Sequence, residues 1–310
     1  MKFVYLIFTH KNPDQLIRLL RRIDNDDALF YIHIDKKVDI TPFKKVEEFI
    51  DPKKIVWLKR ISIIWAGFNM IRAALTGMRE IMKSSEKISH VSLLSGQDYP
   101  IKPVKEFQDF LINNYGKDYI ETHLLPRPNW QHGGKDRYLY HHIIFPKFRL
   151  AWPFFSYVNV KMEFKDPNVY NFFRKILPFV PLAKKFPRKF IKGATPYEGS
   201  QWWTLSMNSV KNIVHSIDTD PTYYDYYKYT HISDEMFFQT VVKNCNINTE
   251  DNIVNNNLRY IDWSDETTGH PVTLTDVDFD ALVNSDRFFA RKFEPDSSIM
   301  DLLDNKVLNR

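Results

Sequence analysis

Apolar runs alternate with amphipathic stretches in the first third of the chain. Residues 3–8 are an apolar run, and residues 29–34, 54–58 and 91–95 are mostly apolar stretches that also predict strands. The stretch after the first run repeats leucine and isoleucine at the spacing of a buried helix face, at Leu16, Leu19, Leu20 and Ile23. Residues 65–82 predict a longer helix whose inward positions are Met70, Ile71, Ala74, Leu75, Met78 and Ile81. This order predicts an α/β fold with a parallel sheet covered by helices.

Polar residues follow three of the predicted strands. Thr9 and His10 come after the first strand, Asp35 after the second, and residues 95–98 end the strand at 91–95. Ligands of open α/β sheets bind at the carboxyl ends of the strands. We therefore expect these residues to form a single candidate site.

The regular pattern stops between residues 124 and 198, where prolines recur among aromatic residues. Seven Lys or Arg residues and no acid lie between Val169 and Tyr197. For residues 171–192 two interpretations stay open, an acceptor-binding flap and a patch for peripheral membrane contact. The prolines exclude one long helix there.

Order returns after Gly199. Residues 201–205 predict a strand, and residues 209–217, 234–243 and 276–284 predict helices. We expect one domain with a long irregular insertion at 124–198.

Composition narrows the possible functions. Aromatic residues make up 15% of the chain, and such rings suit either sugar faces or an aromatic-rich core. The net charge of +5 fits a phosphate-bearing ligand, an anionic surface or an excess of lysine. Cys245 is the only cysteine, which excludes an internal disulfide and favours a reducing, bacterial-type cytoplasm. No apolar run approaches the ~18 residues of a spanning helix, so we expect a soluble or peripheral protein.

Glu235 is the candidate general base. The acids of Ser233-Asp234-Glu235 would suit a helix start, where Ser233 or Asp234 could simply cap backbone amides. However, Phe237 and Phe238 follow and would anchor the next turn, which would hold Glu235 in place. A carboxylate fixed in this way can deprotonate a hydroxyl within hydrogen-bond reach.

Arg291 and Lys292 are the candidate anion-binding pair. They lie among Phe288, Phe289 and Phe293, and these rings would anchor the segment and orient the two cations. The guanidinium fork of arginine suits phosphate oxygens, and lysine adds a compact charge. Preorganised cations would stabilise the charge that develops on a departing diphosphate.

Other chemistries are less well supported. No Walker-type or Gly-x-Gly-x-x-Gly run occurs among the 9 glycines, and no Cys/His spacing suits zinc. Residues 218–220 spell Asp-x-Asp, which could hold a divalent cation, but they follow a predicted helix and precede Pro221, which favours a turn. Nucleic-acid binding is disfavoured because the cations are interleaved with aromatic residues and prolines.

Seven ordered motifs carry a family resemblance. They are Thr9-His10-Lys11, Tyr31-Ile32-His33-Ile34-Asp35-Lys36-Lys37, Trp65-Ala66-Gly67, Leu93-Leu94-Ser95-Gly96-Gln97-Asp98-Tyr99-Pro100-Ile101, Gly199-Ser200-Gln201-Trp202-Trp203, Ser233-Asp234-Glu235 and residues 288–294. With them the chain resembles the core-2/I-branching β-1,6-N-acetylglucosaminyltransferases and, more closely, the peptide O-xylosyltransferases.

The resemblance implies a GT-A-type fold with a Rossmann-like mixed sheet. In a single glycosyltransferase domain, residues 1–123 would bind the nucleotide, through Thr9, His10 and Asp35, and residues 199–310 would hold the acceptor and the catalytic groups. Glu235 would be the base, and Arg291 with Lys292 the diphosphate clamp. Donor and acceptor sugars would meet at Ser95, Gln97, Asp98, Gly199, Ser200, Gln201, Trp202 and Asp234. The xylosyltransferases have an acid at the position of Gln201, so the sugar preference stays open.

The expected reaction is inverting transfer from a UDP-sugar, with β-linkage, to a hydroxyl of a glycan, glycolipid or polysaccharide. UDP-N-acetylglucosamine is the expected donor and UDP-xylose the alternative. No cofactor and no divalent metal is expected, because the paired cations replace the ion. Without the anchor, stem and many cysteines of eukaryotic relatives, we expect a cytoplasmic bacterial enzyme, either free in solution or peripheral at the inner face of the cell membrane. A non-catalytic carbohydrate- or lipid-binding protein on the same fold is the alternative from another class.

Overall fold

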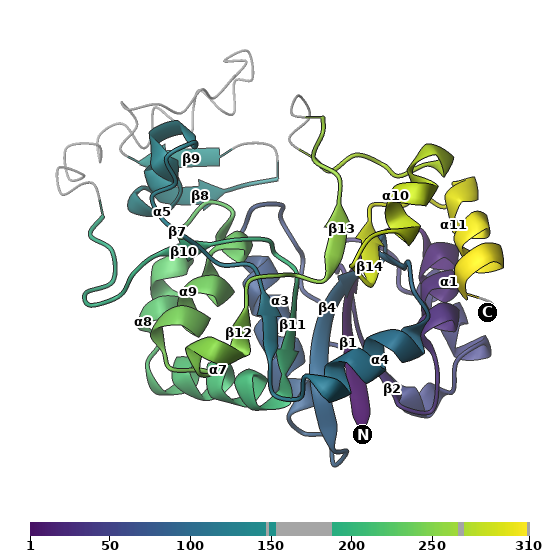
Figure 1. Ribbon diagram of the computed structural model, residues 1–310. Coiled ribbons are helices and arrows are strands. Elements are labelled where there is room, and N and C mark those ends of the chain that lie inside the picture. Colours follow the sequence, from purple (N-terminus) through teal and green to yellow (C-terminus); the bar gives the residue numbers. More distant parts are fainter. Residues whose placement is uncertain (147–148, 153–187, 266–269, 309–310) are drawn as a thin grey trace.

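The structure is a computed structural model that describes residues 1–146, 149–152, 188–265 and 270–308. Within these residues a seven-stranded sheet lies between layers of helices (Figure 1). Its strands in spatial order are β12 (Ile253–Val254), β6 (Asp118–Ile120), β11 (Trp203–Ser206), β4 (Ile88–Ser95), β1 (Lys2–Thr9), β2 (Ala28–Ile34) and β3 (Ile55–Trp57). β1 is parallel to β2 and β4, whereas β11 is antiparallel to β4 and β6. The sheet is therefore mixed and mostly parallel.

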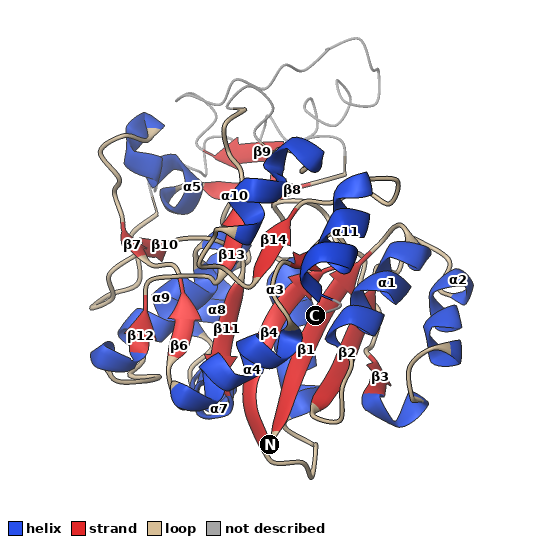
Figure 2. Ribbon diagram, turned by 45° about the vertical axis from the view of Figure 1, so that its right-hand side comes forward, coloured by secondary structure: helices blue, strands red, loops and turns tan. Residues whose placement is uncertain are grey.

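The helices cover both faces of this sheet (Figure 2). One hydrophobic core is formed with the helices α1 (Pro13–Ile23), α2 (Thr41–Lys44), α4 (Val104–Asn113), α10 (Phe279–Val283) and α11 (Ser298–Leu303). The second core, on the other face of the sheet, is formed with α3 (Asn69–Ile81), α7 (Met207–Thr219), α8 (Thr222–Tyr227) and α9 (Phe237–Asn244). Alternate residues of β1 enter the two cores, Phe3, Tyr5 and Ile7 on one side and Val4, Leu6 and Phe8 on the other. Burial on both faces explains why β1 is an uninterrupted apolar run.

Three small sheets lie toward the carboxyl ends of β1, β2 and β4, the upper edge in Figure 2. One joins β13 (Arg259–Ile261), β14 (Phe289–Arg291) and β5 (Tyr99–Pro100). The second pairs β10 (Tyr197–Glu198) with β7 (His123–Leu124), and the third pairs β8 (His141–Ile144) with β9 (Arg149–Trp152). The short helix α5 (Lys135–Leu139) lies beside the last pair (Figure 1). These elements bring distant segments to the strand ends.

Two predicted helices begin later than expected. The helix predicted over 65–82 begins at Asn69, because Ala66 takes a left-handed φ of 62° in the preceding turn. The helix predicted over 234–243 is divided into a 3-10 turn, Ser233–Glu235, and α9, which begins at Phe237. Neither Ser233 nor Asp234 caps α9, because Met236 holds its N-cap position. Ile232, with φ 51°, precedes the 3-10 turn.

Among the described residues, every helix is too short or too polar to cross a bilayer. The predicted acceptor or membrane patch at 171–192 lies mostly outside the described residues, which resume at Arg188.

Candidate functional site

The ends of β1, β2 and β4 touch one another, as the sequence pattern predicted. The amide of Gly96 donates to the carbonyl of Phe8 at 3.0 Å, and the amide of Asp35 donates to the carbonyl of Thr9 at 3.0 Å. A Cβ on Gly96 would lie 2.4 Å from Thr9 Oγ1, so only glycine permits this approach. Thr9, Asp35 and the 95–98 turn therefore lie together at one edge of the sheet.

The Asp35 carboxylate is fully engaged in holding its own turn. The side chain is 7% exposed. Its Oδ1 accepts from the Lys37 amide at 2.9 Å and its Oδ2 from the Ile63 amide at 3.2 Å. His10, by contrast, is exposed. Asp35 fixes the backbone at this strand end whether or not it also contacts a ligand.

Glu294 connects two strand ends and was not singled out as a site residue from the sequence. Its carboxylate pairs with Lys11 Nζ at 3.0 Å and accepts from Gln97 Nε2 at 2.9 Å. One residue earlier, the Phe293 amide donates to the Gln97 carbonyl at 3.0 Å. The predicted sugar-binding residue Gln97 thus has a structural task, which is to attach the segment after Arg291 and Lys292 to the turn after β4.

Strand register brings Asp98 to Arg291. Tyr99 lies opposite Ala290 in the antiparallel pair of β5 and β14, so the adjacent pair of positions is Asp98 and Arg291. Asp98 Oδ1 is 3.5 Å from Arg291 Nε, and the Asp98 side chain is fully buried. The other carboxylate oxygen accepts from the amide of Ser95. Burial raises the pKa of Asp98, and the nearby arginines oppose this rise.

The guanidinium of Arg291 lies over an indole ring. Its central carbon is 4.2 Å from the ring centre of Trp202, which is itself buried. Among the described residues, its terminal nitrogens donate no hydrogen bond. The predicted anchoring is confirmed, because Phe288, Phe289 and Phe293 are all buried. Arg291 is therefore held at its base while its terminal nitrogens stay available to a ligand.

A second arginine, missed by the sequence reasoning, adjoins the same acid. Arg259 is 4% exposed and stands opposite Phe289 in the parallel pair of β13 and β14. Because Phe289 comes two residues before Arg291 on β14, Arg259 and Arg291 lie on the same face of this small sheet. Its Nη1 donates to the Asn257 carbonyl at 2.5 Å, while its buried Nε has no hydrogen-bond partner among the described residues. Burial lowers its pKa to about 10. The available sequence signal was a cation placed directly between Leu258 and the apolar residues of β13.

Asp98, Arg259 and Arg291 together form what we call the arginine cluster. It carries two cations and one acid, which leaves an excess of one positive charge. Lys292 adjoins it along the chain and is partly buried. Its side chain makes no hydrogen bond or ion pair with any other described residue, and its carbonyl accepts from Leu274 at 2.9 Å. Buried, uncompensated positive charge is the electrostatic requirement of an anion site.

Glu235 stands at the opposite end of the candidate site. Its side chain is 32% exposed, and its Oε2 is 3.2 Å from Arg137 Nη1. Partial burial and the neighbouring Asp234 raise its pKa to about 7, which Arg137 opposes. Burial also raises the pKa of Asp234 to about 6. Phe237 and Phe238 are buried, so the predicted anchoring of the turn is confirmed.

Residues 199–202 connect Glu235 to the arginine cluster. The Gly199 amide donates to the Glu235 carbonyl at 2.9 Å, and a Cβ on Gly199 would lie 2.1 Å from the Glu121 carbonyl oxygen. The Ser200 carbonyl accepts from Gln239 Nε2 at 2.6 Å. Trp202, at the other end of the segment, lies under Arg291. These contacts join Glu235, Asp234 and residues 199–202 to Arg291 and Asp98. The turn at residues 95–98 then connects them to the strand ends.

Several buried polar atoms of this structure have no hydrogen-bond partner within the described ranges. They are Gln201 Nε2, Gln239 Oε1, Asp234 Oδ1 and Ser233 Oγ. Buried polar groups in native proteins are normally paired, so each of these needs an explanation. A ligand with several hydroxyl groups would supply the missing partners.

The described residues contain no group of three or more His, Cys, Asp or Glu that could hold a metal ion. Asp218 pairs with Arg79 at 2.5 Å. Asp220 Oδ1 accepts from the Thr222 amide at 2.9 Å, in the turn that the sequence context predicted. Metal independence stays a prediction.

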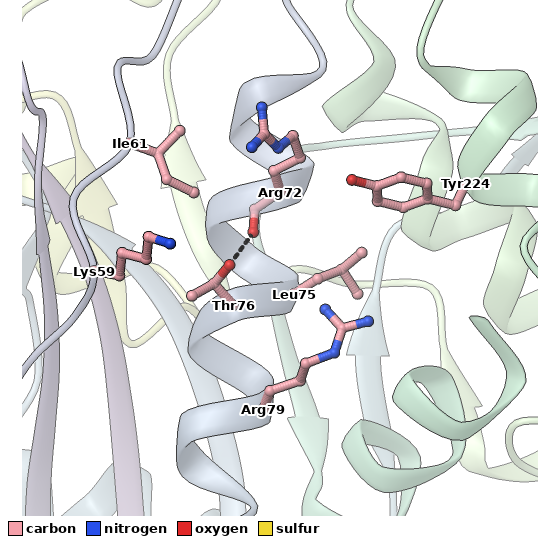
Figure 3. Close-up of a pocket in the computed structure, with 7 residues that line it drawn as sticks. All are labelled: Lys59, Ile61, Arg72, Leu75, Thr76, Arg79 and Tyr224. Atoms are coloured by element: carbon pink, nitrogen blue, oxygen red, sulfur yellow. Dashed lines mark hydrogen bonds between the residues drawn. The ribbon is translucent and has the colours of Figure 1, made fainter. Parts of the chain in front are cut away.

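A separate pocket lies on the outer surface of α3 (Figure 3). It is lined by Lys59, Ile61, Arg72, Leu75, Thr76, Arg79 and Tyr224. None of the predicted site residues lines it, and Lys59 and Arg72 are exposed to solvent. We interpret this pocket as a solvated cationic face of the helix.

Comparisons with known proteins confirm the resemblance drawn from the motifs. The family model described as "Core-2/I-Branching enzyme" matches residues 3–283. Xylosyltransferase 2 of Homo sapiens is 26% identical over 331 residues, covering 98% of this chain and 33% of that protein. A β-glucuronosyltransferase of Arabidopsis thaliana is 33% identical over 147 residues, covering 47% of this chain and 32% of that protein. The chain thus spans about a third of the length of these relatives.

Proposed function

The chain belongs to the Core-2/I-branching enzyme family, and from this premise we propose that it is an inverting, metal-independent glycosyltransferase of the GT-A type. It moves a sugar from a UDP-sugar to a hydroxyl of a glycan, glycolipid or polysaccharide. N-acetylglucosamine is the sugar we favour. Xylose is the second candidate, because relatives whose alignments cover 98% of this chain, at 25% and 26% identity, are named xylosyltransferases.

One observation carries the proposal. A single segment, residues 199–202, has a half-buried carboxylate at one end and a buried cation excess at the other. Displacement at an anomeric carbon needs these two groups, a base for the incoming hydroxyl and a cation for the departing diphosphate. The unpaired buried polar atoms of Gln201 and Gln239 lie along or against this segment, where the sugar would be held.

Glu235 acts as the base in this proposal. With a pKa of about 7, it is ionised in a large fraction of molecules at neutral pH and accepts a proton readily. The acceptor oxygen attacks the anomeric carbon while its proton moves to Glu235. The bond from that carbon to the β-phosphate oxygen breaks on the opposite face, and its electron pair leaves with UDP. An α-linked donor therefore yields a β-linked product.

Arg291 and Lys292 receive the departing diphosphate, and Arg259 adds positive charge behind them. These cations stabilise the transition state more than the bound donor, because negative charge on the diphosphate grows as the bond breaks. Thr9, His10 and Asp35 hold the nucleotide at the strand ends. All these groups come from one domain, in which residues 1–123 and 199–310 meet at the site.

A donor screen tests the proposal. The chain is incubated with UDP-N-acetylglucosamine, UDP-xylose or UDP-glucuronic acid and a panel of sugar acceptors, and the release of UDP is measured. We expect acceptor-dependent release from one donor above all. Binding of UDP without release from any donor would instead support a non-catalytic carbohydrate-binding protein.

A further inference from the structure

Trp130 contacts two arginines that each pair with a different glutamate. The Arg137 guanidinium carbon is 4.1 Å from the ring centre, and that of Arg127 is 5.5 Å from it. Arg137 Nη1 is 3.2 Å from Glu235 Oε2, and Arg127 Nη1 is 2.5 Å from Glu198 Oε1. Both arginines come from the part of the chain where the sequence pattern is least regular, and both reach the segments that build the candidate site.

Backbone contacts hold Arg137 in this place. Its carbonyl accepts from the His231 amide at 3.0 Å, four residues before Glu235. The next carbonyl, of Tyr138, accepts from the hydroxyl of Tyr226 at 2.6 Å. The helix that carries Arg137 is therefore attached to the same loop that carries the carboxylate. The pairing of Arg137 with Glu235 is part of the fold rather than a chance contact between two mobile side chains.

We propose that Arg137 is a positioning residue for Glu235, holding Oε2 so that Oε1 alone is presented to the acceptor hydroxyl. The inference rests on the proposed function, in which Glu235 is the base. Among the described residues, Arg137 provides the only hydrogen bond to the Glu235 carboxylate. The indole of Trp130 stacks on the guanidinium and restricts its rotamers, which reduces the entropy lost in holding one geometry.

The charges around Glu235 give Arg137 a second consequence. Glu198, Asp234 and Glu235 form an acidic cluster, and both neighbouring acids raise the pKa of Glu235 in addition to the effect of burial. Arg137 is the cation that lowers it. Without this cation the pKa of Glu235 would rise, and fewer molecules would have an ionised base at neutral pH.

The pH dependence of kcat/KM distinguishes positioning from a merely structural role. Activity on the acid side falls as Glu235 is protonated. We expect Arg137→Gln to move this acid limb to higher pH by about one unit, which is about a tenfold loss at pH 6 and a smaller loss at pH 9. Arg137→Lys keeps the positive charge, so its acid limb should lie close to the wild-type pH. A uniform loss at every pH, with the limb unmoved, would overturn the proposal.

Arg127→Gln is the matched control. It removes the other arginine on the same indole but leaves the pair between Arg137 and Glu235 intact. The acid limb should therefore move clearly less than in Arg137→Gln, because the unpaired Glu198 acts on the pKa of Glu235 more weakly than Arg137 does. An equal shift in both variants would mean that the whole segment, rather than Arg137, sets the behaviour of the base.

A direct titration separates this inference from the proposed function. The Glu235 carboxyl is followed by carbon NMR in protein labelled at the glutamate side chain, with Glu235→Gln used to assign the signal. We expect a higher pKa in Arg137→Gln than in the wild type, whether or not a donor has been identified. An unchanged pKa would defeat the inference even in an active enzyme. A raised pKa in a protein that never releases UDP would defeat the proposed function instead.

Discussion

The arginine cluster and the acidic cluster stand at opposite ends of one short segment and have opposite charge excess. In the arginine cluster two cations share one acid, and the acid is fully buried. In the acidic cluster three carboxylates share two arginines, and Glu235 keeps 32% of its side chain exposed. The same residue types therefore build two environments, one suited to an anion and one suited to a proton.

Burial explains this difference. A cation that stabilises a departing diphosphate is most effective when it is fixed and dry, because it then needs no reorganisation during the reaction. A base must instead admit the acceptor and exchange its proton with solvent, so it needs partial exposure. The comparison teaches that the two ends should respond differently to substitution. The base end should lose turnover, and the cation end should lose stability and donor recognition.

Glu235→Gln should have the largest effect. Removal of a general base typically lowers the rate of transfer by about 10²–10⁴-fold, whereas the arginine cluster is untouched. We therefore expect transfer to fall by about a thousandfold, while the Kd for UDP, measured by calorimetry, stays within about twofold of the wild-type value. Near-normal transfer would remove Glu235 from the mechanism and with it the functional difference between the two clusters.

Asp98→Asn should give the next largest effect, on stability. The amide retains an acceptor for the Ser95 amide but leaves Arg259 and Arg291 buried without an anion. Loss of one partner from a buried ion pair is typically destabilising by about 3–5 kcal/mol. The free energy of unfolding in urea should fall by about this amount.

Asp218→Asn provides the control for Asp98→Asn. It breaks an aspartate–arginine contact of 2.5 Å whose side chains are 54% and 40% exposed. Exposed pairs contribute about 0–1 kcal/mol, so its stability should hardly change. Equal losses in the two variants would mean that burial does not set the importance of the arginine cluster.

Local sequence pattern was sufficient for the strand ends and for the anchoring of the two charged segments. The strand at 3–8 is fully apolar and the strand at 91–95 is largely buried because both of their faces are covered, and the residues after them had to meet at one edge. Phe237, Phe238 and Phe289 are buried as their positions predicted. In these places the burial of apolar side chains decides the structure, and that information is present in short stretches of sequence.

Long-range pairs account for what the sequence did not reveal. Arg137 lies 98 residues before Glu235, and Arg259 donates to the carbonyl of Leu93 across 166 positions. The late start of α9 has a similar origin, since the amide of Ile232 donates to the carbonyl of Ala66 at 3.0 Å. No periodicity records such contacts. The residue pattern and the family resemblance indicated Glu235, Arg291 and Lys292, but neither indicated Arg137 or Arg259 beside them.

Arg291→Lys tests the arginine cluster separately from the acidic cluster, because it keeps the positive charge but removes the two-pronged guanidinium group. Lysine cannot lie flat over Trp202 or donate two parallel hydrogen bonds to a diphosphate. We expect kcat/KM for the donor to fall by about tenfold, equivalent to about 1.4 kcal/mol, with the acid limb of the pH profile unmoved. A shifted limb would show that the two clusters are coupled rather than separate.

Removal of divalent metal ions with EDTA should have no effect on the release of UDP. If the arginine cluster and Lys292 supply the positive charge that a divalent ion provides in other transferases, EDTA should leave the release of UDP unchanged and added manganese should not raise it. The acids of Asp218-Thr219-Asp220 are engaged with Arg79 and with the Thr222 amide, so a metal would have to displace these contacts. A strict need for manganese would return this Asp-x-Asp to the mechanism. The arginine cluster would then assist a metal ion rather than replace it. The difference between the two clusters would no longer be that one binds the diphosphate without a metal and the other supplies the base.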